Sequence, residues 1–259
     1  MKEPKLKVTL LGTGTSGGVP SLGCNCEVCR SHDAHDKRLR SAALVESDRA
    51  RILIDAGPDL RQQLMPQPFQ PLDAVLLTHV HYDHVGGIDD LRPYCKFGDI
   101  NIYADLNTTD GLRHNMPYCF ADHLYPGVPK LNLHTIFAHV PLTFGDIQVV
   151  PVTVMHDKLP ILGYRFGSFA YITDMKTIAD SELPYLKGVE TLVVNALRFE
   201  KEHHSHQLVA DAIAFSRKIG ARRTYFTHMT HQMGLHEVAS RRLPENFYLG
   251  YDGMVIEIE

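Results

Sequence analysis

Long apolar runs are missing from this sequence of 259 residues. A membrane-spanning helix needs about 20 consecutive apolar residues, and the segment after Met1 lacks the apolar core of a secretory signal. The sequence therefore predicts a cytoplasmic protein without a membrane partner. Positive charge is not in excess either: the sequence has 26 Lys and Arg against 30 Asp and Glu, which gives a formal net charge of −4. Nucleic acid, which requires a basic surface, is accordingly not an expected partner.

Cysteine is also too scarce for a disulfide framework. The chain has five cysteines, an odd number, and the cytosol keeps thiols reduced. Three of them, Cys24, Cys26 and Cys29, follow the spacing C-x-C-x2-C, which is typical of structural zinc in closed four-ligand sites. We expect His231 to supply the fourth ligand, because the cysteines at positions 95 and 119 have no other ligand-type residues beside them. The alternative is three buried thiols packed in a turn.

Strands dominate the hydrophobic pattern. The apolar content of 44% supports a substantial core, and we expect one domain over residues 1–259. Helical periodicity is strongest over His206–Ile219, a shorter helix is expected after Pro58-Asp59, and residues 104–146 predict loops and a short helix over the site. Strands with interspersed helices favour an α/β fold of two sheets covered by outer helices over a doubly wound parallel sheet. Strands are expected at Leu6–Leu11, Ala42–Glu46, Ile52–Ile54, Ala74–Leu77, Ile100–Tyr103, Ile147–Val154, Ile161–Phe166, Phe169–Ile172, Thr191–Val194, Thr224–Phe226 and Met254–Ile258.

The segment His79-Val-His81-Tyr-Asp83-His84 offers four metal ligands within six residues. It follows an apolar run of strand length, so a strand would deliver the ligands to a tight turn. Because side chains alternate in an extended segment, His79 and His81 should point the same way. After the turn, Asp83 and His84 can face a second position. This pattern predicts a binuclear site with nitrogen and oxygen ligands. The alternative is a group of histidines that cap a helix.

Three more candidate ligands each stand at the end of a strand-like run. They are His156, Asp174 and His228. A fold that presents one rim of strand ends would bring them to the same place as the His-rich loop. We therefore include all three in the same predicted centre.

The order and spacing of these residues resemble the metallo-β-lactamase superfamily. Asp55, in the segment Ile-Leu-Ile-Asp-Ala-Gly, is similar to the first motif of that superfamily, in which a buried Asp supports the His-rich loop. The resemblance implies an αββα sandwich and two divalent cations, zinc or manganese, in the active site. It also implies that Asp174 bridges the two ions. One ion would be held by His79, His81, His156 and Asp174, and the other by Asp83, His84, Asp174 and His228.

Within the superfamily, the sequence resembles the phosphoribosyl cyclic phosphate phosphodiesterases of phosphonate breakdown. The motifs that carry this resemblance are the glycine-rich segment 12–20, the three-cysteine cluster, the paired histidines of Thr-His-x-x-His-Gln at 227–232 and the segment 250–254. In that family, three cysteines and the second paired histidine bind structural zinc, which carries over to Cys24, Cys26, Cys29 and His231. The chain departs from the pattern at Asn195, where a carboxylate often follows the strand. The implied substrate is a small cyclic phosphodiester, and a homodimer is left open.

The resemblance also implies a mechanism in which a metal-bridging hydroxide attacks phosphorus. His206 is expected beside the substrate, where it would protonate the leaving oxygen. Asp83 would act at the same centre as ligand and catalytic residue, and Arg198 is a weaker candidate for a phosphate contact. The alternative for His206 is a plain cap at the start of a helix.

Other functions compete with a cyclic phosphodiesterase. An RNA-processing nuclease similar to ribonuclease Z would carry a long Gly/Pro-rich arm, which the sequence lacks. A thioester or lactone hydrolase of the same superfamily is a second alternative, and a non-catalytic metal scaffold is disfavoured by the strand-end placement of the ligands. The pattern Gly12-x-Gly14-x-x-Gly17 formally matches a dinucleotide fingerprint. Because Pro20 and the cysteines follow it instead of a helix, no nucleotide cofactor is expected.

Overall fold

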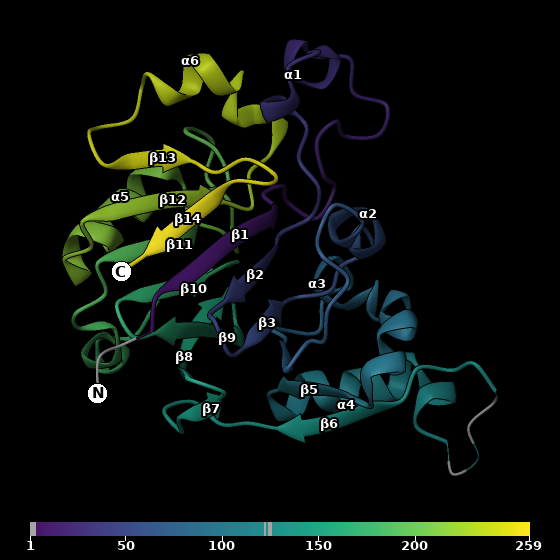
Figure 1. Ribbon diagram of the computed structural model, residues 1–259. Helices are drawn as coiled ribbons and strands as arrows, with labels where there is room; N and C mark the ends of the chain where they lie inside the picture. The colour runs from purple at the N-terminus through teal and green to yellow at the C-terminus, as the bar shows by residue number, and fades with distance from the viewer. Residues whose placement is uncertain (1–3, 122, 124–125) are drawn as a thin grey trace.

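The computed structural model describes residues 4–121, 123 and 126–259, which form two seven-stranded sheets packed face to face (Figure 1). In spatial order, the first sheet contains β14 (Val255–Ile258), β1 (Leu6–Gly12), β2 (Ala42–Glu46), β3 (Arg51–Ile54), β4 (Ala74–Leu76), β5 (Ile100–Ala104) and β6 (Leu131–Thr135). The second contains β13 (Phe247–Leu249), β12 (Arg223–Thr227), β11 (Thr191–Asn195), β10 (Phe169–Ile172), β9 (Leu159–Phe166), β8 (Ile147–His156) and β7 (Leu142–Phe144). The expected αββα sandwich is confirmed.

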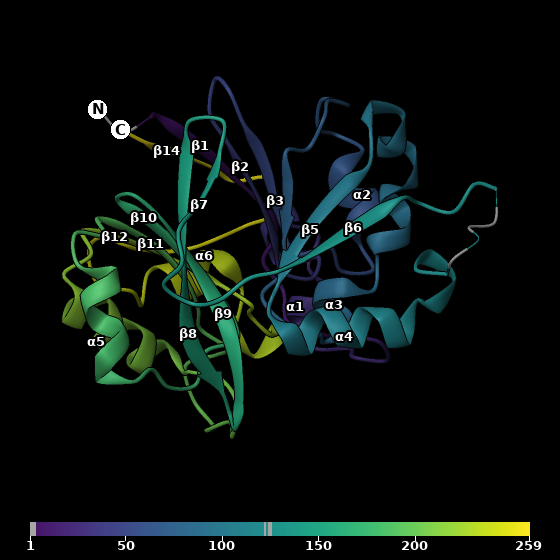
Figure 2. The same cartoon turned by 90° about the horizontal axis from the view of Figure 1, so that it is seen from below.

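Helices cover the outer faces of both sheets. The α-helices are α1 (Glu27–Arg30), α2 (Leu60–Leu64), α3 (Tyr82–Val85), α4 (Leu106–Asn115), α5 (Val209–Ile219) and α6 (His236–Ser240), and 3₁₀ helices cover Ala34–Asp36, Ile88–Phe97, Pro117–Cys119, Asp180–Leu186 and His231–Met233. Seen from below, α2, α3 and α4 lie outside the first sheet and α5 lies outside the second (Figure 2). None of the helices in the described part of the chain has the length and apolar character of a membrane span.

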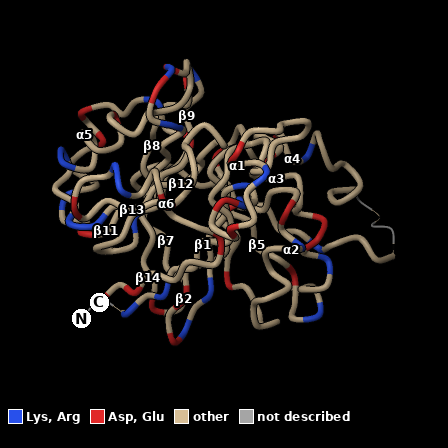
Figure 3. The backbone as a smooth tube through the Cα atoms, turned by 90° about the horizontal axis from the view of Figure 1, so that it is seen from above, with Lys and Arg blue, Asp and Glu red and all other residues tan. Residues whose placement is uncertain are grey.

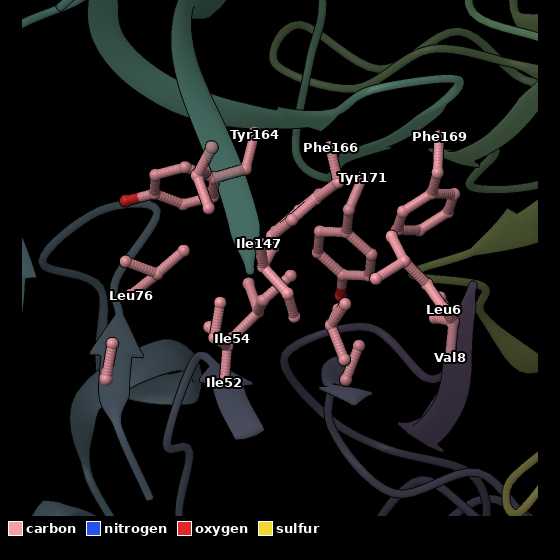
Figure 4. Close-up of a cluster of buried hydrophobic side chains, with 14 of the residues drawn as sticks. Leu6, Val8, Ile52, Ile54, Leu76, Ile147, Tyr164, Phe166, Phe169 and Tyr171 are labelled. Carbon is pink, nitrogen blue, oxygen red and sulfur yellow. The ribbon is translucent and has the colours of Figure 1, made fainter. Parts of the chain in front are cut away.

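The core between the sheets explains why they pack against each other. Side chains from β1, β3 and β4 of the first sheet meet large aromatic side chains from β9 and β10 of the second (Figure 4). Tyr164 and Tyr171 are fully buried there, and the Tyr164 hydroxyl donates a hydrogen bond to the Leu77 carbonyl at 2.5 Å. Burying one large apolar side chain stabilises a fold by roughly 1.5–3 kcal/mol. Along the backbone, positions of Lys and Arg are interspersed with positions of Asp and Glu, in keeping with the small net charge (Figure 3).

The predicted strands are confirmed, but residues 104–146 contain more regular structure than expected. The short helix is present as α4, whereas β6 and β7 add a strand to one edge of each sheet where loops were predicted. The strand β13, at the other edge of the second sheet, was also missed. All three lie at sheet edges, and β7 and β13 have only three residues each. Such short segments offer too few alternating positions to be recognised from sequence.

The helix expected from residue 206 begins later than predicted. It starts at Val209, after the extended N-cap residue Leu208, whose backbone N–H donates to the Asp211 carboxylate at 3.0 Å. Just before it, the Gln207 N–H donates to the Met175 carbonyl. His206 therefore lies before the helix, not at its opening, and this boundary was predicted wrongly. The side chains of His206 and Gln207 are buried although they precede the helix.

One rim of strand ends positions the site. The neighbouring strands β3 and β4 run parallel in the first sheet, and β10, β11 and β12 run parallel in the second, so their carboxyl ends meet at shared edges. Gly57, after β3, lies against the His-rich loop, where a Cβ would come within 2.0 Å of the Asp83 carbonyl oxygen. The glycine therefore allows the two loops to touch. Gly12 likewise allows the chain to pass the Arg40 carbonyl, where a Cβ would come within 1.9 Å.

Candidate metal centre

The structure brings the predicted active-site ligands together in two adjoining groups. One contains His79, His81 and His156, and the other contains Asp83, His84, Asp174 and His228; in each group the ligand atoms lie within 4.8 Å of one another. His79 and His81 precede α3, and His156 ends β8. Asp174 and His228 follow β10 and β12. The alternation inferred from the sequence thus places the residues of the His-rich loop in two neighbouring positions.

In three of these histidines, Nδ1 contacts a neighbouring oxygen atom, which leaves Nε2 directed toward the other ligands. His84 Nδ1 lies 2.7 Å from Asp55 Oδ2, and His228 Nδ1 lies 3.3 Å from Ser41 Oγ. His156 Nδ1 lies 3.0 Å from the Ser205 carbonyl oxygen, to which it donates. A histidine that donates from Nδ1 presents the lone pair of Nε2 to a metal. These contacts therefore orient three of the candidate ligands.

The inward nitrogens fit a metal. Nε2 of His84 and Nε2 of His228 are buried and make no hydrogen bond within the described residues. His84 Nε2 lies 3.2 Å from Asp83 Oδ2 and 3.3 Å from Asp174 Oδ2. Buried nitrogen atoms that converge on carboxylates without hydrogen bonds are the donor arrangement that a divalent cation completes. The donor set is His and Asp, which accepts zinc or manganese.

Asp174 lies between the two groups. Within the second group, its Oδ1 is 3.1 Å from His228 Nε2 and its Oδ2 is 3.3 Å from His84 Nε2. Asp174 also lies within ligand distance of His156, which belongs to the first group. Thr173 Oγ1 donates to Oδ2 at 2.6 Å. Burial raises the pKa of Asp174, but His228 and His84 outweigh it and hold the pKa well below its usual range. Asp174 is therefore ionised, as a carboxylate that holds a cation would have to be.

Three residues of the centre adopt the left-handed backbone conformation that non-glycine residues rarely adopt. Asp55, Asp174 and His228 have φ values of 61°, 57° and 54°. Each immediately follows a strand or stands one residue beyond it. Such conformations persist where the surrounding contacts fix them, and they concentrate at functional sites. The turn after each strand therefore aims its side chain back across the strand ends.

His206 lies at the inner edge of the centre. Its ring centroid is 4.7 Å from that of His156 and 4.8 Å from that of His228, and its Nδ1 is 3.8 Å from Asp174 Oδ1. Burial, followed by His228, lowers its pKa to about 2, so the ring is neutral near pH 7 before substrate binds. His156, Asp174 and His206 also form a group within ligand distance. The proton-donor role of His206 stays a prediction.

Arg198 is directed toward its own loop. Its Nε donates to the Lys201 carbonyl at 2.8 Å, and NH1 donates to Gln232 Oε1 at 2.6 Å. NH2 lies 3.3 Å from the Glu202 carbonyl oxygen. These contacts make Arg198 a support for the segment that leads to His206. The predicted phosphate contact stays a prediction.

A second cluster contains the three cysteines and the paired histidine. Cys24, Cys26, Cys29 and His231 have ligand atoms within 4.8 Å of one another, and His231 Nδ1 lies 3.4 Å from Cys24 Sγ and 3.2 Å from Cys26 Sγ. His231 lowers the pKa of Cys26 to about 6, whereas burial raises that of Cys29 to about 11. A cation is required to hold all three as thiolates, and three thiolates with one imidazole match structural zinc. The remaining two cysteines are not in this cluster.

Several residues that support the two clusters were missed from the sequence. Ser41 stands at the start of β2, far from His228 along the chain, so its contact could not be read from a local pattern. Asn195, seen only as a departure from a family pattern, accepts from the Met175 N–H at 2.8 Å and donates to its carbonyl at 2.9 Å. Its amide fixes the turn after Asp174, which needs both a donor and an acceptor.

A buried polar network joins the two ends of the chain beneath the thiolate cluster. Arg38 donates to Thr13 Oγ1 at 2.8 Å and to the Gly250 carbonyl at 2.6 Å. The Asp252 carboxylate accepts from Thr13 Oγ1 at 2.8 Å and from the Leu39 N–H at 2.6 Å. The segment 250–254 carried part of the family resemblance. Its contacts in this network indicate that it stabilises the fold near the thiolate cluster's segment of chain and is not itself a ligand segment. Thr13, which stands in the glycine-rich segment, belongs to the same network.

The fold and the two donor sets together define a metal-dependent hydrolase with strand-end ligands on an αββα sandwich. Comparison with known proteins agrees. The family model described as "Beta-lactamase superfamily domain" matches residues 50–229. A solved structure of a diphosphatase from the PhnP family has a TM-score of 0.90 with 36% identity and covers 98% of this chain and 97% of its own. The chain belongs to the metallo-β-lactamase superfamily and lies close to the PhnP family within it, which confirms the resemblance inferred from the sequence.

Two curated relatives carry other names. An octanoyltransferase of Porphyromonas gingivalis is 45% identical over 250 residues, which are 96% of this chain and 51% of that protein. The chain thus spans about half the length of this relative. A coenzyme PQQ synthesis protein B of Methylobacterium radiotolerans is 34% identical over 219 residues, covering 73% of this chain and 72% of the relative.

Proposed function

We propose that this protein hydrolyses a small phosphodiester, with a cyclic phosphate on a ribose as the preferred class. The observation that carries the proposal is the place of Asp174, which stands in one donor group with Asp83, His84 and His228 and also lies within ligand distance of His156 of the other group. This arrangement suits two cations held side by side, and paired cations stabilise both the attacking and the leaving oxygen of an in-line displacement at phosphorus. The similarity to a diphosphatase of the PhnP family supports the same class.

The cations would be held by the residues of the two donor groups. When bound, they lower the pKa of water toward ~7 and neutralise charge on phosphoryl oxygens. The residues of the chain orient the ligands and provide the proton for the leaving oxygen. Asp55, Ser41 and the Ser205 carbonyl keep the ligand rings oriented, and Asp83 supplies a carboxylate beside His84. His206 stands where a leaving oxygen near Asp174 and His156 would receive a proton.

Access to the centre is provided at the His-rich turn. His81 is exposed, and the neighbouring Tyr82 is 70% exposed, whereas His84 and Asp174 are buried. A substrate therefore meets the centre at His81. The open position is what a catalytic metal site requires, in contrast to the closed thiolate cluster.

A substrate comparison tests the proposal. We expect metal-loaded protein to cleave bis-p-nitrophenyl phosphate and a ribose cyclic phosphate, and Asp174→Asn to lose both activities. Hydrolysis of a lactone or a thioester without any cleavage of the phosphodiesters would refute it. Release of p-nitrophenolate and chromatography of the ribose product provide the two measurements.

Hydrolysis of an acyl thioester is the second candidate. It is favoured by an apolar cavity of about 260 Å³ between the start of α4 and β9, lined by residues that include Leu106, Phe137, Ile161 and Leu162. The Leu162 N–H donates to the Thr78 carbonyl at 3.0 Å, next to the ligand His79. The similarity to a protein named octanoyltransferase gives the acyl class a reason to be tested. An octanoyl thioester belongs in the same substrate comparison.

A further inference from the structure

His203 makes a specific contact that the mechanism above does not use. Its Nδ1 lies 3.4 Å from the Ser205 backbone nitrogen and 3.1 Å from the Ser205 Oγ. A backbone N–H can only donate, so Nδ1 of His203 accepts and the ring carries its proton on Nε2. The hydroxyl then donates to the same nitrogen. His203 therefore determines where the Ser205 backbone and side chain lie.

Ser205 in turn contacts a candidate metal ligand. Its carbonyl oxygen accepts from His156 Nδ1 at 3.0 Å, and Ser205 is only 6% exposed. This hydrogen bond fixes the His156 tautomer and turns Nε2 toward His79 and His81. Groups that hold the outer nitrogen of a ligating histidine typically change metal affinity or activity by about 10–100-fold when they are removed.

The segment between β11 and α5 is held at both ends, and its middle is held by the contacts of Ser205 with His203 and with His156. At one end, Arg198 donates to the carbonyls of Lys201 and Glu202. At the other end, the Gln207 N–H donates to the Met175 carbonyl. Lys201 has a φ of 65°, which turns the chain sharply toward the centre. Between these anchors, the contact from His203 to Ser205 closes the turn that presents the Ser205 carbonyl.

The ring of His203 also packs beside His206. The two centroids are 5.0 Å apart with planes inclined by 31°, and His206 itself lies 4.7 Å from His156. His203 is half-buried, whereas its neighbour His204 is exposed. The two adjacent histidines thus face different surroundings, and only His203 makes the contact to Ser205.

We infer that His203 is a positioning residue of the metal centre: it holds the Ser205 carbonyl against His156 and backs the ring of His206. The effect acts through the Ser205 main chain, which any residue at that position would offer, so the side chain that matters is that of His203. The inference rests on the metal centre and not on the identity of the substrate. A wrong substrate assignment would leave its main measurement, metal affinity, unaffected.

Three variants of the full-length protein test the inference. His203→Ala removes the acceptor, His203→Asn offers a side-chain oxygen in a similar place, and His204→Ala is the matched control in the same segment. Metal-depleted protein is titrated with Co²⁺, and the visible absorption of Co²⁺ at the His/Asp centre reports binding. We expect about a tenfold loss of affinity in His203→Ala, the lower end of the range for a partner of a ligand. His203→Asn should recover most of it, and His204→Ala should match the parent.

The outcomes separate a positioning role from a structural one. A lower melting temperature in His203→Ala with unchanged Co²⁺ affinity would assign His203 to stability alone and overturn the inference. Equal losses in His203→Ala and His203→Asn would overturn it as well, because the acceptor would then not matter. If the parent protein binds Co²⁺ but cleaves no phosphodiester, the proposed function fails while the comparison of variants remains valid.

Discussion

The imidazole of His84 and the carboxylate of Asp55 meet 2.7 Å apart, between Nδ1 and Oδ2, and neither side chain is exposed to solvent. Asp55 also accepts from the backbone N–H of Thr78 at 2.8 Å and from its hydroxyl. One buried carboxylate therefore joins the end of β3 to both ends of the His-rich turn. Since a buried charge is costly unless it is paired and hydrogen-bonded, these contacts make the turn rigid before any cation binds.

We expect Asp55→Asn to weaken metal binding at the His/Asp centre by about 10–100-fold, the usual effect of losing a carboxylate behind a ligating histidine. The amide keeps the size of the side chain but cannot accept from His84 and Thr78 with two charged oxygens. Metal titration of the purified variant measures the change. Asp90→Asn, at an exposed carboxylate, is the control and should bind as the parent does.

The protein should hold metal at two kinds of site that differ in how tightly they bind it. The thiolate cluster is closed by four protein ligands and should hold about one zinc tightly, whereas the His/Asp centre should release up to two ions to a mild chelator. Elemental analysis before and after chelation measures both. Simultaneous loss of all metal would contradict the division into two sites.

The two clusters should also respond differently to single substitutions. Asp174→Asn should reduce phosphodiesterase activity by more than the ~100-fold that loss of a residue behind a ligand costs. The reason is that Asp174 belongs to one donor group and also lies within ligand distance of His156 of the other. Cys26→Ala should mainly lower stability, since a closed zinc site contributes to folding. A loss of about 2 kcal/mol corresponds to ~4–8 °C in melting temperature for a chain of this size. A Cys26→Ala protein that melts like the parent would show that the cluster has no structural role.

The ligand set could be predicted from the sequence because each ligand stands in a local pattern. His79, His81 and His84 are separated by fixed short steps, and Asp174 and His228 each follow an apolar strand. Strand alternation and strand ends are properties of a few consecutive residues, which a sequence displays directly. The superfamily resemblance then supplied the pairing of distant segments.

The supporting contacts could not be predicted in the same way. The Ser41 hydroxyl reaches His228, and the Ser205 carbonyl reaches His156, across turns whose geometry depends on tertiary packing. Every residue has a backbone carbonyl, so the sequence does not indicate which carbonyl contacts a ligand. The start of α5 was misplaced for a related reason, because the buried side chain of His206 lies beside the ligands and not on a helix face.

Stability should depend on pH through Asp252. Burial raises its pKa from 3.8 to about 6, so the folded protein binds this proton more tightly than the unfolded chain. The stabilisation is therefore present at low pH and is lost as the pH rises through about 6. Asp252→Asn cannot ionise, and relative to the parent it should gain about 3 kcal/mol between acidic and neutral pH, at ~1.4 kcal/mol for each pKa unit. Urea unfolding of both proteins at several pH values measures the difference, and a constant difference would exclude titration of this carboxyl.

His206 provides the sharpest test of the chemistry. If it protonates or stabilises the leaving oxygen, His206→Ala should act most strongly on substrates with poor leaving groups, such as the ribose alkoxide of a cyclic phosphate. General acid catalysis typically contributes ~10²–10⁴-fold, and a loss of that size is expected there. A p-nitrophenolate leaving group needs little protonation, so its cleavage should suffer far less.

Metal content and the pH profile decide between the roles open to His206. A ligand would lose an ion together with both activities, which is the outcome expected if its proximity to Asp174 and His156 reflects coordination. A purely structural role would lower stability and leave both activities unchanged. Because the pKa of His206 is lowered to about 2 by burial and by His228, a proton donor must gain its proton as the anionic substrate binds. The alkaline limb of kcat for the cyclic phosphate, which reports loss of this proton from the enzyme–substrate complex, should then disappear in His206→Ala. Equal losses on both substrates, with metals intact, would instead show that His206 only positions the substrate.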